Sequence, residues 1–323
     1  MQIKKSLCTF TGKIIDYAGL FPPANLNLKN AFGNYLKYLD ENYNFMLSKF
    51  ICPVSLFPEL KDLVSEVPSR DLKIIISALG RGGSDLNSFK KNLEEDLAIW
   101  NKFVSGLKEN INVNSFEVKI PIEIISSCDS DNIALFLDSL SNNIKQQISQ
   151  PVMIFVEGSS NDKWKENTVS LINGIEIHNQ KNFDTGFKLR TGGTEANAFP
   201  SSHQIAFSIR KCLDRKVPMK FTAGLHHPFP HYDSEINAAM HGFVNVFASG
   251  IIAMRHDISD SVLEEVLNDK NPLNFIFTDD NFSWNNWKVE IADIEYARKD
   301  LVLSYGSCSF DEPVEDLKSL HLL

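Results

Sequence analysis

Charged side chains interrupt several short apolar segments of this sequence. They are lysines, an arginine and carboxylates, which are residue types that catalyse reactions of small molecules or bind them. Lys188 and Arg190 alternate with apolar residues in 186–191 (GFKLRT), and Lys220 lies within the apolar segment 218–223 (PMKFTA). The whole set comprises Asp16, Glu117, Lys119, Glu157, Lys188, Arg190 and Lys220. A lysine amine can act as a nucleophile, a carboxylate can move protons, and a guanidinium can hold an anionic group.

The segments that carry these residues belong to a regular alternation along the chain. Short runs rich in Ile, Val and Phe are each followed by a longer stretch with helical spacing. The predicted strands are 13–18, 46–54, 73–79, 116–122, 151–157, 186–191, 218–223 and 274–279. The predicted helices are 26–41, 58–67, 85–108, 129–147, 164–180, 201–216, 234–255, 260–268 and 291–304.

Eight strand-helix units predict an α/β protein with a parallel sheet closed into a (β/α)8 TIM-type barrel. We expect one domain over 1–323, with 306–323 as a packed C-terminal tail. The eighth strand is placed at 274–279, with 243–247 as the alternative strand. A doubly wound open sheet is the alternative fold, but no GxGxxG follows the first predicted strand.

The barrel interior is where the seven charged residues should meet. The outward face of each strand packs against helices and should be apolar, so a charge within a strand is expected to point inward. Buried charges must pair, and one alternative is a structural ion-pair lattice, for example Glu117 with Lys188. The other is an active site at the carboxyl ends of the strands. Four basic and three acidic groups favour an anionic substrate held by Arg190, with Lys119 and Asp16 among its contacts.

The segments after strands six and seven add further candidates at the same end. Gly192, Gly193 and Ser201 are candidates for binding an anion, and Thr222 shares a strand face with Lys220. His226 and His227 are candidates for general acid/base work. The alternative is a divalent metal site of His226 and His227 with Glu157, together with His241 or His203, although no HxH or HExxH spacing is present.

Composition narrows the classes of protein. The formal net charge is −9 and no basic block is present, so we expect no nucleic-acid partner. The segment 242–254 is too short to span a membrane, and residues 1–5 do not lead into an apolar signal region, so no membrane partner and no secretion signal are expected. Five scattered cysteines without CxxC indicate a reducing compartment, hence a cytoplasmic protein. The sequence is compatible with a homo-oligomer.

Several phrases resemble known proteins. DYAGLFPPA, KLRTGG, TAGLHHP and MHGFVNVF are similar to phrases of a bacterial family of uncharacterised barrel proteins. The segments 187–192 (FKLRTG) and 220–224 (KFTAG) locally resemble class I (Schiff-base) aldolases of the deoxyribose-phosphate aldolase type. This resemblance implies that Lys188 forms the imine, that Lys220 is the neighbouring ammonium, and that Glu117 supplies the acid of strand four. Arg190 and the acidic segment 278–281 depart from the aldolase pattern and place a phosphorylated sugar in doubt.

We therefore expect an enzyme of lyase or aldolase character that acts on a small anionic metabolite with a carbonyl group. Lys188 would be the nucleophile and Lys220 its electrostatic neighbour, Glu117 or Glu157 would move protons with His226 or His227, and no cofactor would be needed. One alternative is a metal-assisted hydrolase or lyase that uses His226, His227 and Glu157. The other is a non-catalytic barrel that binds an anionic metabolite.

Overall fold

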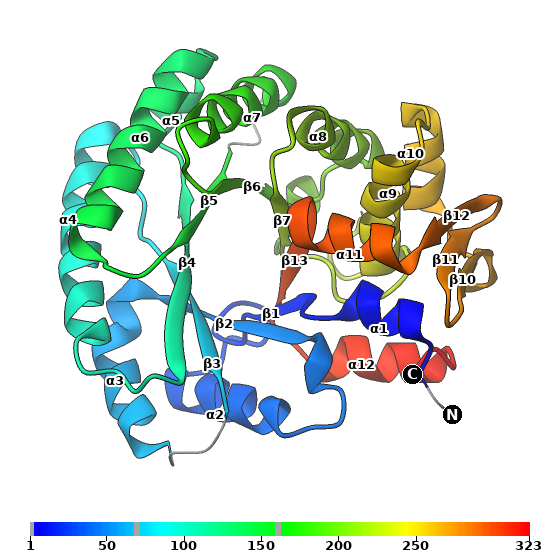
Figure 1. The fold of residues 1–323 in the computed structure, drawn as a ribbon, viewed down its shortest axis with the longest axis horizontal. Helices are drawn as coiled ribbons and strands as arrows, with labels where there is room; N and C mark the ends of the chain where they lie inside the picture. Colours follow the sequence, from blue (N-terminus) through cyan, green and yellow to red (C-terminus); the bar gives the residue numbers. More distant parts are fainter. Residues whose placement is uncertain (1–2, 68–71, 159–162) are drawn as a thin grey trace. The chain divides into compact units, whose positions relative to one another are not determined.

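The computed structural model describes residues 3–67, 72–158 and 163–323, and its central feature is a closed barrel of eight parallel strands (Figure 1). The strands follow one another around the barrel in the order β1-β13-β7-β6-β5-β4-β3-β2. They are β1 (Ile15–Tyr17), β2 (Leu47–Pro53), β3 (Ile74–Leu79), β4 (Ile111–Lys119), β5 (Met153–Glu157), β6 (Thr185–Arg190), β7 (Met219–Thr222) and β13 (Val302–Ser307). The predicted (β/α)8 barrel is therefore confirmed.

Helices connect the strands, as parallel pairing requires. The α-helices before β7 are α1 (Lys5–Thr11), α2 (Leu28–Leu39), α3 (Phe57–Glu66), α4 (Leu86–Val104), α5 (Ile122–Ile125), α6 (Ser130–Gln147), α7 (Trp164–Asn179) and α8 (Ser202–Arg215). Those after β7 are α9 (Phe243–Arg255), α10 (Asp260–Asn268), α11 (Ile291–Asp300) and α12 (Asp311–Ser319). Short 3-10 helices are η1 (Asn44–Met46), η2 (Val54–Leu56), η3 (Ala196–Ala198) and η4 (Pro272–Asn274). None of the described helices combines the length and apolar character needed to cross a bilayer.

The connection between β7 and β13 differs from the prediction. The segment 274–279 was predicted as the eighth barrel strand, but β10 (Phe275–Phe277) pairs in an antiparallel sheet with β11 (Asn281–Trp284) and β12 (Trp287–Glu290). The alternative strand 243–247 is also wrong, because these residues begin α9. The true last strand is β13 (Val302–Ser307), and its first residues were predicted to end a helix over 291–304. The start of the helix predicted from 234 is also corrected, since β8 (His231–Asp233) and β9 (Ala238–Met240) form a hairpin before α9.

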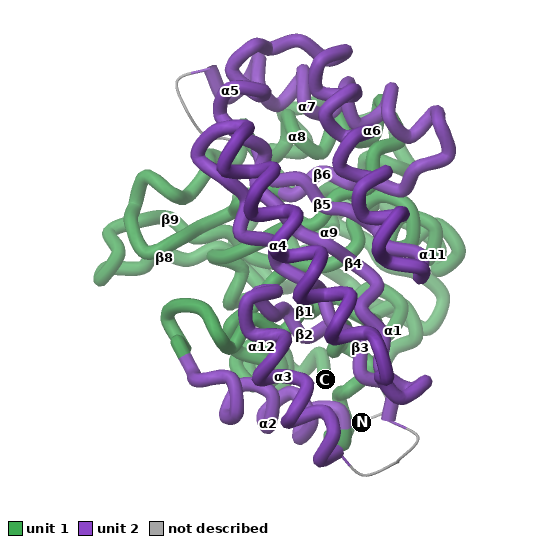
Figure 2. Tube along the Cα trace, turned by 90° about the vertical axis from the view of Figure 1, so that its left-hand side faces the viewer, with its two compact units in different colours: residues 1–25, 40–48, 189–323 green, residues 26–39, 49–188 purple. Residues whose placement is uncertain are grey.

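The chain forms two compact units, each made of separate stretches of sequence (Figure 2). Unit 1 comprises 1–25, 40–48 and 189–323, and unit 2 comprises 26–39 and 49–188. Within unit 2 the ladder runs from β2 through β3, β4 and β5 to the start of β6, and within unit 1 β13 pairs with both β1 and β7.

Apolar side chains on the strands pack against helices in both units. In unit 2 the ring of Phe116 on β4 stacks on Trp100 of α4, with centroids 5.7 Å apart. In unit 1 the ring of Phe221 on β7 contacts Phe247 of α9 at 5.4 Å. Since successive side chains of a strand point to opposite faces, the residues that precede or follow these phenylalanines point into the barrel. Those residues are Glu117 and Lys220.

Candidate functional site

The side chain of Lys188 lies between two carboxylates in unit 2. Its Nζ atom is 3.1 Å from Oε2 of Glu117 on β4 and 3.1 Å from Oε2 of Glu157 on β5. Parallel pairing of β5 and β6 places Glu157 directly beside Lys188. On β4 the residue paired with Glu157 is Lys119, and Glu117 lies two residues before it, on the same face of the strand. The exposed fractions of the three side chains are 7% for Lys188, 1% for Glu117 and 10% for Glu157. Three of the seven predicted charges therefore form one buried cluster at the carboxyl ends of β5 and β6.

A chain of hydrogen bonds extends this cluster toward β2. Lys49 donates from Nζ to Ser115 Oγ at 3.1 Å, Ser115 donates to Ser77 Oγ at 2.9 Å, and Ser77 donates to Oε1 of Glu117 at 2.6 Å. All four residues lie on strands, so their backbone positions are held by the barrel ladder. One oxygen of Glu117 thus accepts a hydrogen bond from a serine while the other faces Lys188, which orients the carboxylate toward the amine.

Lys119 and Arg190 are not part of the buried cluster. Both are the last residues of their strands and both are exposed. A strand end opens toward the loops of the carboxyl face, which is where barrel enzymes bind their substrates. The roles of Lys119 and Arg190 in holding an anionic group stay predictions.

Unit 1 contains a second buried ion pair, between Lys220 and Asp16. Nζ of Lys220 is 2.6 Å from Oδ2 of Asp16, and both side chains are fully buried. The Oγ of Ser304 on β13 also donates to Oδ2 of Asp16, at 2.6 Å. Asp16 thus contacts Lys220 in unit 1, and its predicted contact with a substrate stays a prediction. Because Lys188 belongs to unit 2, the effect of Lys220 on Lys188 stays a prediction.

His226 and His227 each contact a carboxylate of α12, the helix of the C-terminal tail. Nδ1 of His226 is 3.1 Å from Oε2 of Glu312, and Nδ1 of His227 is 2.6 Å from Oδ2 of Asp316. The Sγ of Cys308 lies 3.9 Å from Nδ1 of His226. A histidine held by a carboxylate has a fixed ring orientation, which suits proton transfer. The same contacts also attach the tail to the segment after β7.

Burial alone would lower the pKa of His226, but the contacts with Cys308 and Glu312 outweigh it and raise the pKa to about 9. The hydrogen bond from His226 lowers the pKa of Glu312 below its usual value. A histidine whose pKa is higher in the folded state stabilises the protein below its unfolded pKa of 6.5, and this stability is lost as the pH rises through about 9.

We expect the free energy of unfolding to fall between pH 6.5 and 9 more steeply in the wild type than in Glu312→Gln. Urea unfolding at several pH values measures this, and equal slopes for the two proteins would contradict it.

The glycines after β6 have a packing role in unit 1. A Cβ atom on Gly192 would lie 2.6 Å from Cα of Gly224, so these two backbones approach more closely than any other residue allows. Thr191 donates its backbone N–H to the carbonyl oxygen of Thr222 at 2.9 Å, which joins the same two segments. A Cβ on Gly193 would likewise lie 2.8 Å from Cβ of Ala198. Close packing therefore accounts for both glycines, and anion binding by this loop stays a prediction.

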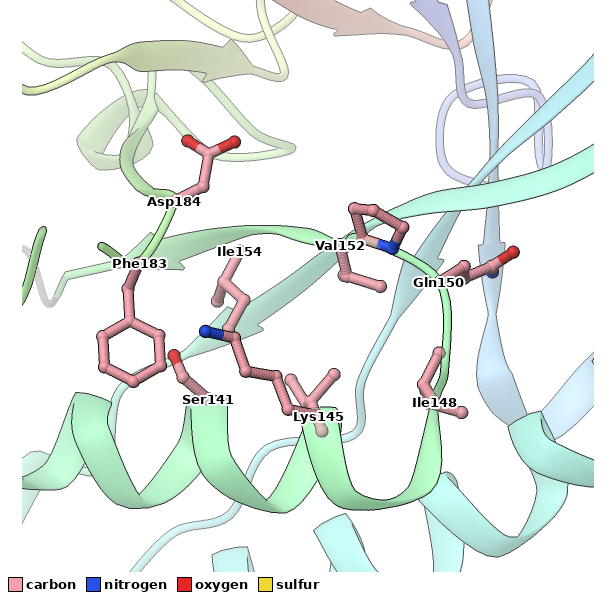
Figure 3. Close-up of a pocket in the computed structure, with 10 residues that line it drawn as sticks. Ser141, Lys145, Ile148, Gln150, Val152, Ile154, Phe183 and Asp184 are labelled. Carbon is pink, nitrogen blue, oxygen red and sulfur yellow. The ribbon is translucent and has the colours of Figure 1, made fainter. Parts of the chain in front are cut away.

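A surface pocket in unit 2 lies away from the predicted site residues (Figure 3). It is lined by α6, by residues just before and within β5, and by Phe183 and Asp184 before β6. These positions are at the amino ends of the strands, whereas Lys188 and Glu157 are at or near the carboxyl ends.

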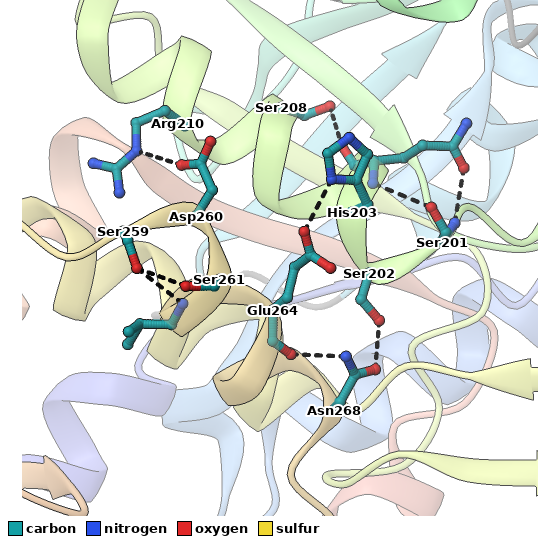
Figure 4. A network of polar contacts seen from close by, with 12 residues as sticks. Ser201, Ser202, His203, Ser208, Arg210, Ser259, Asp260, Ser261, Glu264 and Asn268 are labelled. Atoms are coloured by element: carbon teal, nitrogen blue, oxygen red, sulfur yellow. Dashed lines mark hydrogen bonds and ion pairs between the residues drawn. The ribbon is translucent and has the colours of Figure 1, made fainter.

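Ser201 and His203 are engaged in contacts at the start of α8 (Figure 4). The Oγ of Ser201 caps α8 by accepting from the backbone N–H of Gln204 at 3.3 Å, and Nδ1 of His203 is 2.9 Å from Oε1 of Glu264 on α10. Nε2 of His241 lies 2.6 Å from the carbonyl oxygen of Pro200.

Within 3–67, 72–158 and 163–323, no three His, Cys, Asp or Glu side chains are grouped so as to hold a metal ion. No observation therefore favours the metal-assisted alternative.

Several polar partners of these groups were not predicted from the sequence. Lys49 is a charge within a predicted strand, so the same alternation argument applied to 46–54 would have found it. Ser77 and Ser115 gave no signal, because a single serine in an apolar strand is common. Glu312 and Asp316 were missed because the tail was not resolved into a helix, although their spacing of four residues places them on one helical face.

Comparisons with known proteins add no identification. No family model, no curated protein and no solved structure matches the chain. The described fold is a (β/α)8 barrel, and the resemblance to Schiff-base aldolases stays a prediction.

Proposed function

We propose that the protein is a barrel enzyme of lyase or aldolase character in which Lys188 forms an imine with a small anionic carbonyl compound. The observation that carries this proposal is the amine of Lys188 held 3.1 Å from each of two buried carboxylates on neighbouring strands. An amine that must lose and regain protons during a reaction needs such proton acceptors in direct contact. The location also supports the proposal, since the cluster lies toward the carboxyl ends of the barrel strands.

The chemistry follows from these contacts. Glu117 or Glu157 takes a proton from the Lys188 ammonium, and the neutral amine adds to the carbonyl carbon of the substrate. The resulting hydroxyl group receives the proton back from the carboxylic acid and leaves as water, so that a cationic imine remains. This cation accepts the electrons of a C–C or C–H bond next to the former carbonyl carbon, and an enamine forms. When the bond is C–H, a carboxylate accepts the proton; when it is C–C, a carboxylate takes the proton of the β-hydroxyl group and the other fragment leaves as an aldehyde. Protonation of the enamine carbon and addition of water to the imine then release the carbonyl product and restore the amine of Lys188.

The anionic part of the substrate would be bound at the strand ends. Lys119 is exposed at the end of β4 in unit 2, Arg190 is exposed at the end of β6 in unit 1, and a guanidinium offers two parallel N–H donors to a carboxylate. His226 and His227 would assist proton transfer, each oriented by a carboxylate of α12. This assignment needs no cofactor.

Reductive trapping tests the proposal. Incubation with pyruvate or a short aldehyde and sodium borohydride should convert the imine to a stable secondary amine, seen as one adduct in the intact mass. Lys188→Arg should lose this adduct, because an arginine keeps the positive charge between Glu117 and Glu157 but does not form an imine. Lys90→Met, which changes an exposed lysine of α4, is the matched control and should keep it. An adduct of equal yield in Lys188→Arg would overturn the proposal.

The ion pairing itself favours a second candidate, the non-catalytic barrel that binds an anionic metabolite. Lys188 and Lys220 are each held by carboxylates, so their charges are balanced within the protein, as in a structural lattice. Under this alternative an anionic metabolite raises the melting temperature through Arg190 and Lys119, and no carbonyl compound is trapped. The borohydride experiment therefore separates the two candidates.

A further inference from the structure

Three side chains of unit 2 that the proposed function does not use form a hydrogen-bonded series on α6 and α7. The Oγ of Ser141 is 3.0 Å from Nε2 of His178, and Nδ1 of the same ring is 2.6 Å from Oδ1 of Asp138. Serine and aspartate thus contact opposite nitrogens of one imidazole. This is the arrangement of nucleophile, base and orienting acid that serine hydrolases of unrelated folds share, and it is identified by geometry rather than by position in the sequence.

The direction of these hydrogen bonds follows from the charges. Hydrogen bonds from Lys181 and His178 outweigh burial and lower the pKa of Asp138, so its carboxylate is ionised and only accepts hydrogen bonds. Burial lowers the pKa of His178, so the ring is neutral at neutral pH. Nδ1 must therefore carry the only ring proton, which leaves a lone pair on Nε2. The Ser141 hydroxyl donates to that lone pair, as a serine does before its proton is removed.

The orientation of the imidazole is fixed on several sides. The ring of Phe183 stacks on His178 with centroids 4.3 Å apart and planes 10° from parallel. Lys181 holds the second oxygen of Asp138 at 2.5 Å. His178 is fully buried, so bulk water does not compete with Asp138 for Nδ1. A base that is held in place and kept from water is a requirement for nucleophilic catalysis by serine.

Ser141 also lines the pocket at the amino ends of β5 and β6 (Figure 3). The cavity volume of the pocket is about 60 Å³, well below that of a site for a drug-sized ligand, so it admits only a small group such as an acetyl. Most of its lining is apolar, and Lys145 is the basic side chain among the described lining residues. Lys145 follows Ser141 by one helical turn, and its Nζ lies 3.9 Å from the centroid of Phe183. The pocket thus joins an apolar surface for an acyl group to a cation suited to a developing negative oxygen.

We propose that Ser141, His178 and Asp138 form a second catalytic site, which hydrolyses small esters with a short apolar acyl group. The hydroxyl oxygen of Ser141 bonds to the ester carbonyl carbon while Nε2 of His178 takes the hydroxyl proton. The bond to the alcohol oxygen then breaks, and His178 returns the proton to that alcohol. Water, activated by the same nitrogen, releases the carboxylic acid and restores Ser141. Lys145 stabilises the oxygen that carries negative charge between these steps.

This site is independent of the imine chemistry proposed for Lys188. Ser141 and His178 lie toward the carboxyl ends of helices α6 and α7, next to the amino ends of the strands that follow them. Lys188 and Glu157 lie at the other ends of the same strands. Variants of one site should therefore leave the other unchanged.

A fluorophosphonate probe, which phosphonylates activated serines, tests the proposal on the full chain. We expect one probe per molecule, attached to Ser141 in the peptide map, and hydrolysis of p-nitrophenyl acetate. Ser141→Ala should lose the labelling and lower the hydrolysis by at least about a hundredfold. Ser139→Ala, which removes an exposed hydroxyl from the same helix, is the matched control and should retain both.

Asp138→Asn provides a second variant that keeps the size of the side chain but removes the charge that fixes the His178 ring proton on Nδ1. It should also lose hydrolysis, while circular dichroism shows a folded protein. Reductive trapping at Lys188 should be unaffected in Ser141→Ala. Absence of labelling at Ser141, or hydrolysis equal to the wild type in Ser141→Ala, would overturn the proposal and leave these residues as a structural link between α6 and α7.

Discussion

Replacing Lys220 by methionine should lower the free energy of unfolding by about 3–5 kcal/mol, because it removes the cation in direct contact with the buried Asp16 carboxylate. Both side chains are fully buried, and their charged atoms are 2.6 Å apart. The hydrogen bond from Ser304 keeps Asp16 in place but does not neutralise it. Urea unfolding of wild type and Lys220→Met at neutral pH measures the difference.

The double variant Asp16→Asn/Lys220→Met separates the effect of charge from that of packing. It removes both charges and keeps an acceptor for Ser304, so it should recover much of the lost stability. Lys270→Met changes an exposed lysine in unit 1 and should alter the free energy of unfolding by less than about 0.5 kcal/mol. A loss below about 1 kcal/mol in Lys220→Met would show that the buried Asp16–Lys220 pair adds little to stability.

Replacing Glu117 by glutamine should slow adduct formation at Lys188 by roughly 10²–10⁴-fold, the usual contribution of a positioned acid or base. Glutamine keeps an acceptor for Ser77 but takes no proton from Lys188. Glu157 still faces the amine, so the ammonium keeps one ionic partner and the variant should fold. The measurement is the rate at which the borohydride-reduced adduct appears in the intact mass with pyruvate as the carbonyl compound.

Glu94→Gln, at an exposed position of α4, is the control for this series and should react at the wild-type rate. Glu157→Gln should also slow the reaction, since either carboxylate contacts Nζ of Lys188. A wild-type rate in both Glu117→Gln and Glu157→Gln would show that neither carboxylate moves the proton.

Periodicity in the sequence was sufficient for seven of the eight strands. Segments such as 73–79 and 151–157 are bounded by turn residues, and β3 and β5 lie within them. The last strand was missed because α11 runs into β13 through Leu301 alone, with no glycine or proline between them. The segment 274–279 is as apolar as a barrel strand, but its partners are β11 and β12, which only tertiary structure decides.

Alternation along the strands also placed much of the candidate site. It predicts that Glu117 and Lys188 share the inward side, and parallel register then brings them within 3.1 Å. The alternation of side chains along a strand does not determine which charged groups pair, so an ion-pair lattice and an active site both remained as alternatives. It also says nothing about helices, and the contacts of His226 and His227 with α12 depend on how the tail packs.

Ser141, His178 and Asp138 were not predicted because they come from two helices in which each residue looks ordinary. Ser141 and Asp138 are three residues apart on α6, and His178 lies near the end of α7. Only the packing of one helix on the other brings the two nitrogens of the imidazole to a hydroxyl and a carboxylate.

The most direct test of the central claim is to identify the lysine that carries the adduct after borohydride reduction of the wild-type protein with pyruvate. Tandem mass spectrometry of the digested protein distinguishes the peptides that contain Lys188 and Lys220. We expect the reduced adduct on Lys188, in a yield far above that of any exposed lysine. An adduct on Lys220, or an even distribution over surface lysines, would contradict the assignment of Lys188 as the reactive amine.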